Sequence, residues 1–361
     1  MKLGFGLMRL PRKGPIIDIE QTKKMVDMFL EAGGTYFDTA FIYPGSEDAT
    51  RKALVTRHPR ESYTLATKLF AGYIPTEKMA KDELHTSLKR TGAEYIDYYL
   101  LHTLMESNYR KYDKFGLWDF VKEEKAKGTI RHYGFSFHDG PELLERILSA
   151  HPDVDFVQLQ IKYADWENPK VTSRANYEVA RKYGIPIVVM EPVKGGTLAN
   201  PPRDVKALLT DYAPDASPAS WAIRFVASLD GILSVLSGMS NIAQMEDNLS
   251  YMRDFQPLSA QEMEVIHEAQ RLLGHSKTIA CTSCHYCTEG CPKQIPIPEI
   301  FSALNLELGS GQGDAARESY RKILEKGNGA DACIACGQCE RRCPQHLNII
   351  ESLKQAASTL Q

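Results

Sequence analysis

Short apolar runs alternate along the chain with longer segments whose hydrophobic residues recur at helical spacing. The apolar runs are rich in β-branched and aromatic residues, which is typical of buried strands. Eight such runs predict strands at residues 3–10, 35–38, 63–68, 96–102, 130–136, 156–160, 187–190 and 232–236. Helices are predicted after them, at residues 18–31, 46–56, 75–91, 117–127, 141–149, 171–183, 216–228 and 243–253. Eight strand–helix units predict an α/β fold, a (β/α)8 barrel of the TIM type.

The chain is longer than such a barrel requires. It has 361 residues, whereas a TIM barrel takes about 250. Two domains are therefore predicted, the barrel at residues 1–256 and a smaller module at residues 257–361, with helices at residues 259–273 and 298–308. Hydrophobic residues make up 43% of the chain and charged residues 25%, so both parts can bury a core.

Charge and hydropathy limit the kinds of partner that the protein is expected to bind. The formal net charge is -3 and no block of lysine and arginine occurs, which argues against binding to nucleic acid or to an anionic membrane. Residues 1–6 carry no apolar signal-peptide core, and no apolar run approaches the roughly 18 residues of a membrane span. We therefore expect a cytoplasmic protein whose ligands are small molecules.

Polar residues suited to acid–base chemistry stand at the ends of three successive predicted strands. Asp38, Lys68 and His102 end the second, third and fourth strands, and Tyr43 follows five residues after Asp38. In a parallel barrel the carboxyl ends of the strands converge on one open face, so these four side chains are expected to meet. Singly, each has an ordinary structural explanation, as a cap, a solvated lysine or a hydrogen-bonded histidine. As a set they predict a catalytic site.

The set resembles the catalytic tetrad of the aldo-keto reductases. The resemblance implies reduction of a small carbonyl compound, or oxidation of an alcohol, with NAD(P)H. Tyr43 would give a proton to the carbonyl oxygen. Lys68 would lower the pKa of that phenol and Asp38 would hold Lys68 charged, while His102 would donate a hydrogen bond to the same oxygen.

The longest loop predicted at this face covers residues 103–116. It contains Tyr109 and Tyr112, and loops at the catalytic face of a barrel often shape the substrate site. We predict a substrate lid here, with a surface loop carrying two packed tyrosines as the alternative.

The nucleotide is expected where barrels usually bind phosphate, in the loops after the seventh and eighth strands. In the first of these loops Gly195 and Gly196 would let backbone amides approach a pyrophosphate, with Lys194 as a counter-charge. The family resemblance implies further contacts: Ser136 and Gln158 to the nicotinamide carboxamide, and Asp247 and Asn248 to the adenosine.

The chain departs from the family pattern in three places. Phe137 follows Ser136 where an asparagine is usual, and Met190 stands where many members stack a tyrosine on the nicotinamide. Gly238 and Gln244 replace the basic pair that grips the 2′-phosphate of NADPH. NADH, or use of both nucleotides, is therefore expected rather than strict use of NADPH. The departures also leave room for a flavin, of which the sequence shows no signature, or for a degraded cofactor site.

All eight cysteines lie between Cys281 and Cys343. They form two C-x₂-C-x₂-C-x₃-C-P runs, the pattern of bacterial two-cluster ferredoxins, in which the fourth cysteine of each run serves the other cluster. This predicts one [4Fe-4S] cluster on Cys281, Cys284, Cys287 and Cys343, and a second on Cys333, Cys336, Cys339 and Cys291. Two structural zinc ions are the alternative, but zinc sites favour two separated C-x₂-C pairs.

A barrel followed by such a helical ferredoxin-like module resembles the bacterial and archaeal aldo-keto reductases that carry a ferredoxin domain. Two functions follow. The first is an oxidoreductase whose clusters relay electrons or sense redox state, with a one-electron partner such as a ferredoxin. The second is an iron–sulfur electron-transfer protein, flavin-linked or not, whose barrel is mainly a scaffold.

Overall fold

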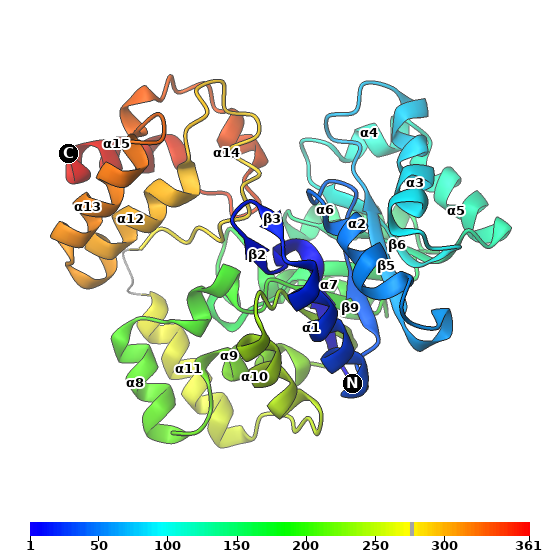
Figure 1. Cartoon of the computed structure of the whole chain (residues 1–361), viewed down its shortest axis with the longest axis horizontal. Coiled ribbons are helices and arrows are strands. Elements are labelled where there is room, and N and C mark those ends of the chain that lie inside the picture. Colours follow the sequence, from blue (N-terminus) through cyan, green and yellow to red (C-terminus); the bar gives the residue numbers. More distant parts are fainter. Residues whose placement is uncertain (275–277) are drawn as a thin grey trace. The chain divides into compact units, whose positions relative to one another are not determined.

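The computed structural model describes residues 1–274 and 278–361. The chain forms two compact units (Figure 1). The first comprises Met1–Asn168, Thr172–Pro192 and Ala219–Met263, and the second comprises Pro169–Val171, Val193–Pro218 and Glu264–Gln361. The second unit thus includes the segment that follows the seventh barrel strand as well as the cysteine-rich part. The predicted domain boundary at residue 256 stays a prediction.

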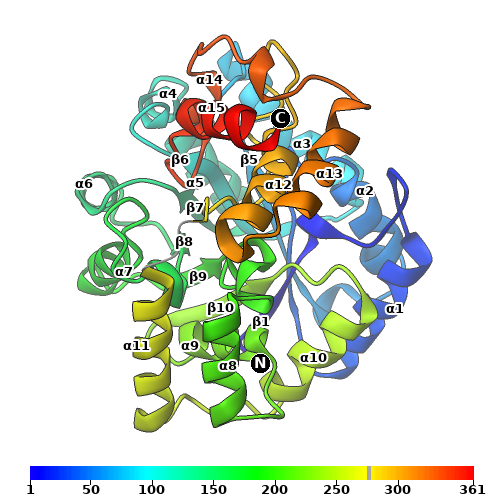
Figure 2. The ribbon, with the colours of Figure 1, turned by 90° about the vertical axis from the view of Figure 1, so that its left-hand side faces the viewer.

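Eight parallel strands close into a barrel, as predicted (Figure 2). The strands are β1 (Leu3–Gly6), β4 (Tyr36–Asp38), β5 (Thr64–Leu69), β6 (Ile96–Leu104), β7 (Ile130–Phe137), β8 (Phe156–Gln160), β9 (Ile187–Met190) and β10 (Ile232–Ser237). Each pairs with its neighbours in chain order, and β10 pairs with β1. The carboxyl ends of β4, β5 and β6 therefore lie side by side at one rim.

Helices follow the strands at the predicted places. They are α1 (Ile19–Glu31), α2 (Ser46–Thr50), which continues as a π-helical turn at Arg51–Val55, α3 (Glu77–Thr91), α5 (Leu117–Lys127), α6 (Pro141–Ala150), α7 (Ser173–Lys182), α9 (Pro218–Ala227) and α10 (Ile242–Met252). Side chains that cap backbone N–H groups explain where several of these helices begin. Asp18, for example, accepts a hydrogen bond of 3.2 Å from the backbone N–H of Gln21 at the start of α1.

The barrel interior is filled by one side chain from each of six strands: Tyr36, Ala66, Leu100, Phe156, Val188 and Leu236. Aromatic rings join the barrel to the helices outside it. Phe29 of α1 lies 5.8 Å from Phe5 of β1 and 5.2 Å from Phe37 of β4, measured between ring centroids. Strand residues that alternate inward and outward thus fill two apolar layers, as continuously apolar strands require.

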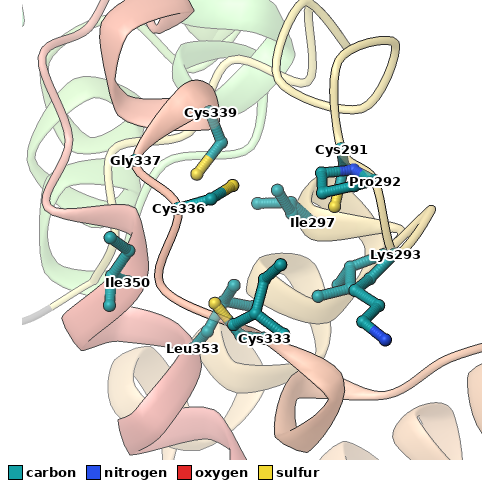
Figure 3. Close-up of a pocket in the computed structure, with 12 residues that line it drawn as sticks. Cys291, Pro292, Lys293, Ile297, Cys333, Cys336, Gly337, Cys339, Ile350 and Leu353 are labelled. Carbon is teal, nitrogen blue, oxygen red and sulfur yellow. The ribbon is translucent and has the colours of Figure 1, made fainter.

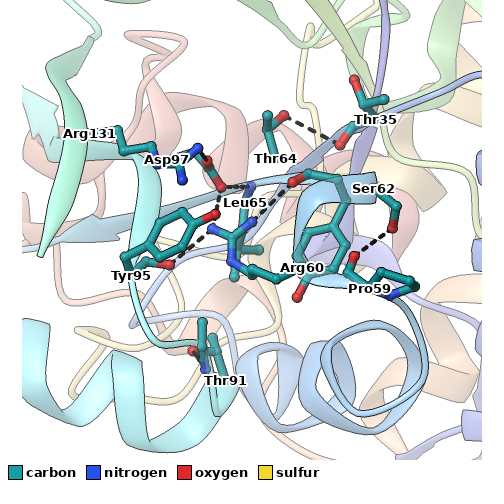
Figure 4. Close-up of polar contacts among 12 residues, drawn as sticks. Thr35, Pro59, Arg60, Ser62, Thr64, Leu65, Thr91, Tyr95, Asp97 and Arg131 are labelled. Carbon is teal, nitrogen blue, oxygen red and sulfur yellow. Dashed lines mark hydrogen bonds and ion pairs between the residues drawn. The ribbon is translucent and has the colours of Figure 1, made fainter. Parts of the chain in front are cut away.

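A partly buried ion pair ties together the amino-terminal ends of three strands (Figure 4). Arg60 Nη2 lies 2.5 Å from Asp97 Oδ2, and that oxygen also accepts the backbone N–H of Leu65 at 2.9 Å. The guanidinium of Arg60 stacks 3.8 Å from the ring centroid of Tyr95, and that of Arg131 stacks 3.9 Å from it. Because this group lies at the rim opposite the strand ends that carry Lys68 and His102, we assign it to stability.

Several elements differ from the sequence-based expectation. The first strand ends at Gly6, and residues 7–9 form a 3₁₀ turn followed by a hairpin of β2 (Arg12–Lys13) and β3 (Ile16–Ile17). A helix α8 (Arg203–Tyr212) was not predicted. The predicted lid contains α4 (Tyr109–Lys114), and Tyr112 is fully buried, donating a hydrogen bond to the carbonyl of His102. For Tyr112 the packed alternative is therefore correct.

The cysteine-rich region is mainly helical, as expected. Its helices are α11 (Ala260–Gly274), α12 (Ile297–Ser310), α13 (Gly313–Leu324), α14 (Gln338–Arg342) and α15 (Ile349–Leu360). Isoleucine, leucine and aromatic side chains of α12, α13 and α15 form its core, including Phe301, Tyr320 and Leu353. Among the described residues, none of the helices is long and apolar enough to cross a membrane.

Candidate active site and cluster cavities

The four predicted catalytic residues meet at the carboxyl ends of β4, β5 and β6. Lys68 Nζ donates hydrogen bonds to Asp38 Oδ1 at 2.5 Å and to the carbonyl of Thr39 at 2.7 Å. The same nitrogen lies 5.2 Å from the ring centroid of Tyr43. The Tyr43 ring meets the His102 ring edge to face, with centroids 5.8 Å apart. Lys68 thus stands between the Asp38 carboxylate and the ring of Tyr43.

The Asp38–Lys68 pair is buried, and burial shapes its electrostatics. Lys68 is fully buried and Asp38 nearly so. Burial lowers the pKa of the Lys68 ammonium, while Asp38 and then Glu47 oppose that shift. Burial likewise raises the pKa of the Asp38 carboxyl, against the attraction of Lys68. Each charge is compensated chiefly by the other, so removal of either partner would leave an uncompensated charge away from water.

His102 is a neutral imidazole near pH 7. Burial, followed by the charges of Lys68 and His138, holds its pKa well below the ordinary value of 6.5. Its Nδ1 is buried and has no hydrogen-bond partner within the part of the chain that the structure describes. Tyr43, by contrast, is half-buried, in the turn that follows β4. A neutral histidine and an accessible phenol at one rim can together contact a carbonyl oxygen.

Two residues expected at the nicotinamide lie side by side on adjacent strands. Ser136 of β7 pairs in register with Gln158 of β8, and both are buried. Ser136 Oγ accepts the backbone N–H of Thr103 at 2.7 Å. The Oε1 atom of Gln158 is buried without a hydrogen-bond partner among the described residues. An unpaired buried acceptor suits an amide donor such as a carboxamide NH₂.

The eight cysteines surround two cavities in the crosswise pattern predicted from their spacing. Cluster cavity 1, of about 320 Å³, is lined by Cys281, Cys284, Cys287 and Cys343. Cluster cavity 2, of about 330 Å³, is lined by Cys291, Cys333, Cys336 and Cys339 (Figure 3). Among the described residues, no group of three or more His, Cys, Asp or Glu side chains is placed to hold a single metal ion.

The two cysteine runs fold as copies of one another. Left-handed backbone conformations occur at Ser283, His285 and Gln294 in the first run and at Ala335, Gly337 and His346 at the equivalent positions of the second. Most of these are not glycines, and such conformations persist only where the surrounding structure imposes them. Burial raises the pKa of the Cys287 thiol and raises that of Cys339 to about 11, so cluster assembly would have to displace these protons.

Comparison with known proteins assigns both parts of the chain. The family model described as "Aldo/keto reductase family" matches residues 2–271, and the model described as "4Fe-4S dicluster domain" matches residues 280–349. The chain belongs to the aldo-keto reductase family. It is an oxidoreductase of that family with an attached dicluster domain. The family implies a small carbonyl substrate, and the dicluster domain implies two clusters.

Relatives and solved structures agree with this assignment. The chain is 28% identical to aldo-keto reductase str7 of Strobilurus tenacellus over 240 residues, 60% of this chain and 68% of the relative. It is 26% identical to an aldo-keto reductase of Mycobacterium avium (strain 104) over 286 residues, 78% and 91% of the two chains.

Among solved structures, the holo form of aldo-keto reductase AKR11C1 from Bacillus halodurans gives a TM-score of 0.59 at 24% identity, covering 74% and 91% of the two chains. An aldo-keto reductase from Klebsiella pneumoniae in complex with NADPH gives 0.60 at 19% identity, covering 75% and 90%. These structures support the barrel fold.

The residues that the resemblance assigns to adenosine contacts have partners within the protein. Asn248 is buried, and both ends of its amide are engaged: Nδ2 donates to Ser237 Oγ at 2.9 Å and Oδ1 accepts the Tyr251 hydroxyl. Gln244 Oε1 accepts the backbone N–H of Ser240 at 2.7 Å. Asp247 is half-buried on the same helix, α10. These contacts fix the loop after β10.

An arginine distant in sequence lies beside this loop. A Cβ built on Gly238 would lie 3.9 Å from the Cβ and 4.0 Å from the Cδ of Arg9, and 4.0 Å from the carbonyl oxygen of Gly6. The hydroxyl of Ser240 also donates to the Arg9 carbonyl at 2.8 Å. Arg9 was not predicted here, because nothing local in the sequence relates residue 9 to residue 238.

Other polar residues of the reductase escaped sequence analysis. Glu83 of α3 is buried, accepts the backbone N–H of Phe70 at 2.8 Å, and has a pKa raised to about 8 by burial. Its place on the buried face of α3, which also carries Ala80 and Leu84, was the available signal. Glu47, also buried, accepts Thr67 Oγ1 at 2.8 Å. Both carboxyl groups support the strand that carries Lys68.

A second buried lysine follows β8. Lys162 Nζ lies 3.0 Å from Gln160 Oε1, 3.4 Å from Glu191 Oε2 and 3.5 Å from Asp165 Oδ2. Gln160 in turn contacts His138 Nδ1 at 2.7 Å. Met190, at the end of β9, packs against the interior cluster of the barrel. The network orders the rim beside Met190, where the resemblance expects the nicotinamide.

Proposed function

We propose that the barrel transfers hydride between NAD(P)H and a small carbonyl or alcohol at Asp38, Tyr43, Lys68 and His102. The observation that carries this is the position of the Lys68 ammonium, bonded to Asp38 and facing the ring of Tyr43. Membership of the aldo-keto reductase family supports the reaction class.

Each residue has a defined role in the reducing direction. The nucleotide, when bound, supplies hydride to the carbonyl carbon. Tyr43 gives its hydroxyl proton to the carbonyl oxygen. Lys68 stabilises the phenolate left behind, because a nearby positive charge favours the anionic form of a phenol. His102, neutral for the reasons given above, donates a hydrogen bond to the same oxygen as negative charge develops there.

The proposed nucleotide contacts do not select strictly for NADH or for NADPH. Ser136 and Gln158 would hold the carboxamide, which is common to NADH and NADPH. Gly238 and Gln244 offer no charge to a 2′-phosphate, but the aliphatic stem of a basic residue, Arg9, passes close to Gly238. The Klebsiella pneumoniae relative is seen with NADPH. The sequence predicted NADH or use of both nucleotides, and of these two alternatives we propose use of both, because a relative is seen with NADPH.

The clusters serve one-electron chemistry separate from hydride transfer. A hydride carries two electrons together, whereas a [4Fe-4S] cluster passes one, and a flavin is the usual intermediary. We propose that the clusters exchange electrons with a one-electron partner or regulate the site. A Cys284→Ser and Cys336→Ser double variant that remains folded should therefore keep measurable carbonyl reduction at saturating NAD(P)H. Complete loss of activity in that folded variant, or stoichiometric flavin in the wild type, would overturn this separation.

The departures from the family pattern at Phe137, Gly238 and Gln244 favour a second candidate function. It is an iron–sulfur electron-transfer protein whose barrel has lost nucleotide binding. A titration of tryptophan fluorescence with NADPH and with NADH separates the two. Saturable quenching, with turnover in a screen of aldehydes, ketones and quinones, supports the reductase. Absence of binding by either nucleotide supports the electron-transfer protein.

A further inference from the structure

The loop after β9 lies against the backbone of the first cysteine run. A Cβ built on Gly195 would lie 2.4 Å from the carbonyl oxygen of Thr282 and 2.7 Å from its Cα. Real Cβ atoms do not come within 3.0 Å of other heavy atoms, so only glycine allows this approach. Both residues belong to the second compact unit. The tight contact is therefore an internal feature of that unit.

Thr282 belongs to the cluster-binding part of the chain. It follows Cys281 directly and precedes Cys284 by two residues, and both of these cysteines line cluster cavity 1. The backbone N–H of Ser283 donates to Cys281 Sγ at 3.4 Å. Any ligand that fixes Cys281 and Cys284 therefore also fixes the Thr282 backbone between them.

The second cysteine run provides an internal comparison. Ile334 occupies the position equivalent to Thr282, and it is 58% exposed, whereas Thr282 is 2% exposed. Polarity alone would predict the reverse, because isoleucine is usually buried and threonine usually exposed. The difference comes from packing: the first run is covered at this position and the second is not.

The loop after β9, which packs against Thr282, has an unusual backbone. Lys194, Gly195 and Gly196 have φ values of 50°, 67° and 104°. A lysine in the left-handed region is strained, and such strain persists where neighbouring structure imposes the conformation. The Thr282 backbone is the neighbour that Gly195 contacts most closely.

We propose that the first cysteine run, with its cluster in place, holds Lys194–Gly196 in the conformation that receives the pyrophosphate of the nucleotide. Thr282 is then a positioning residue that acts through Gly195. Occupancy of cluster cavity 1 and nucleotide affinity are linked, whereas cluster cavity 2 has no such link. This proposal rests on the proposed function, since it needs a nucleotide at Lys194–Gly196.

Linkage is reciprocal. If the first cluster strengthens nucleotide binding, then the nucleotide strengthens binding of the first cluster by the same factor. Between linked sites, one ligand commonly changes the affinity for the other by roughly 5- to 150-fold. In the wild-type holoprotein, saturating NADPH should therefore slow the loss to a chelator of about half the iron, the share held by one of two clusters. Equal rates with and without NADPH would contradict the proposal, and this measurement needs no variant.

Adjacent glycines provide a matched pair of variants. Gly195→Ala and Gly196→Ala both place an alanine at positive φ, but only the first meets Thr282, because nothing lies within 4 Å of a Cβ at Gly196. We expect Gly195→Ala to raise the Kd for NADPH by about tenfold or more and to speed loss of half the iron. Gly196→Ala should keep the wild-type rate of iron loss, whatever it does to the Kd.

The outcomes separate this proposal from the function on which it rests. If the wild-type protein binds neither NADH nor NADPH, the proposed function fails. If the wild type binds NADPH but Gly195→Ala matches it in both Kd and iron loss, the function stands and the linkage is wrong. Cys284→Ser and Cys336→Ser repeat the comparison at equivalent ligands. Only Cys284→Ser should raise the Kd, and equal effects of the two would also contradict the proposal.

Discussion

Lys68 Nζ lies 2.5 Å from Asp38 Oδ1 and 5.2 Å from the ring centroid of Tyr43, and no part of the lysine is exposed to solvent. A buried ammonium is stable here because a carboxylate from the neighbouring strand neutralises it. The same arrangement aims the positive charge at the phenol. One ion pair therefore contributes both to the stability of the barrel rim and to the proposed proton transfer.

Replacing Lys68 by methionine should separate these two contributions. The variant leaves the Asp38 carboxylate buried without its partner, which typically costs 3–5 kcal/mol in the free energy of unfolding. Turnover should fall by roughly 10²-fold or more, since the charge beside Tyr43 is lost. In the double variant Lys68→Met with Asp38→Asn, urea unfolding should show most of the stability restored and turnover still low. Recovery of turnover in the double variant would mean that the charge on Lys68 is not needed.

The depressed pKa of His102 predicts a particular pH dependence of stability. In the unfolded chain this imidazole takes up a proton as the pH falls through about 6.5, while in the folded protein it stays neutral to much lower pH. Below pH 6.5 the unfolded state therefore binds more protons, and stability decreases as the pH falls. Relative to His102→Gln, the wild type should lose up to about 1.4 kcal/mol per pH unit below 6.5. Parallel profiles of unfolding free energy against pH would show that His102 protonates alike in both states.

The ion pair at the opposite rim should matter for stability alone. Asp97 is buried and accepts hydrogen bonds from Arg60 and from the backbone of Leu65. Asp97→Ala should lower the free energy of unfolding by about 3 kcal/mol without changing turnover per folded molecule. Glu145→Ala, which removes an exposed partner of Lys182, should cost less than about 1 kcal/mol. Reduced turnover in the folded Asp97→Ala protein would assign this group a role beyond stability.

The cysteine arrangement predicts the metal content. Four cysteines line each cavity, and the crosswise pattern is that of two [4Fe-4S] clusters. Anaerobically purified protein should contain about eight irons and eight acid-labile sulfides per chain, with a brown chromophore. Stoichiometric zinc without that chromophore would reject the assignment and restore the alternative of two structural zinc sites.

Local sequence pattern was sufficient to predict the barrel fold, the convergence of Asp38, Tyr43, Lys68 and His102 at one rim, and the crosswise grouping of the cysteines. These features follow from strand periodicity and from short spacings, which a single sequence displays directly. The approach of Arg9 to Gly238 and of Gly195 to Thr282 was not predictable, because each depends on packing between segments remote in the chain. Tyr112 was assigned to the predicted substrate lid, because its hydrogen bond to the His102 carbonyl cannot be inferred from local sequence.

The most direct test of the proposed chemistry is the single-turnover rate of Tyr43→Phe with a carbonyl substrate found in the reductase screen. Removal of the phenolic hydroxyl takes away the proton donor but keeps the ring that faces Lys68 and His102. The rate should fall by roughly 10²-fold or more, with the Kd for NADPH changed little. Tyr73→Phe, at an exposed tyrosine that packs against Phe70, is the matched control and should react at the wild-type rate. Near wild-type turnover in Tyr43→Phe would contradict the assignment of the tetrad.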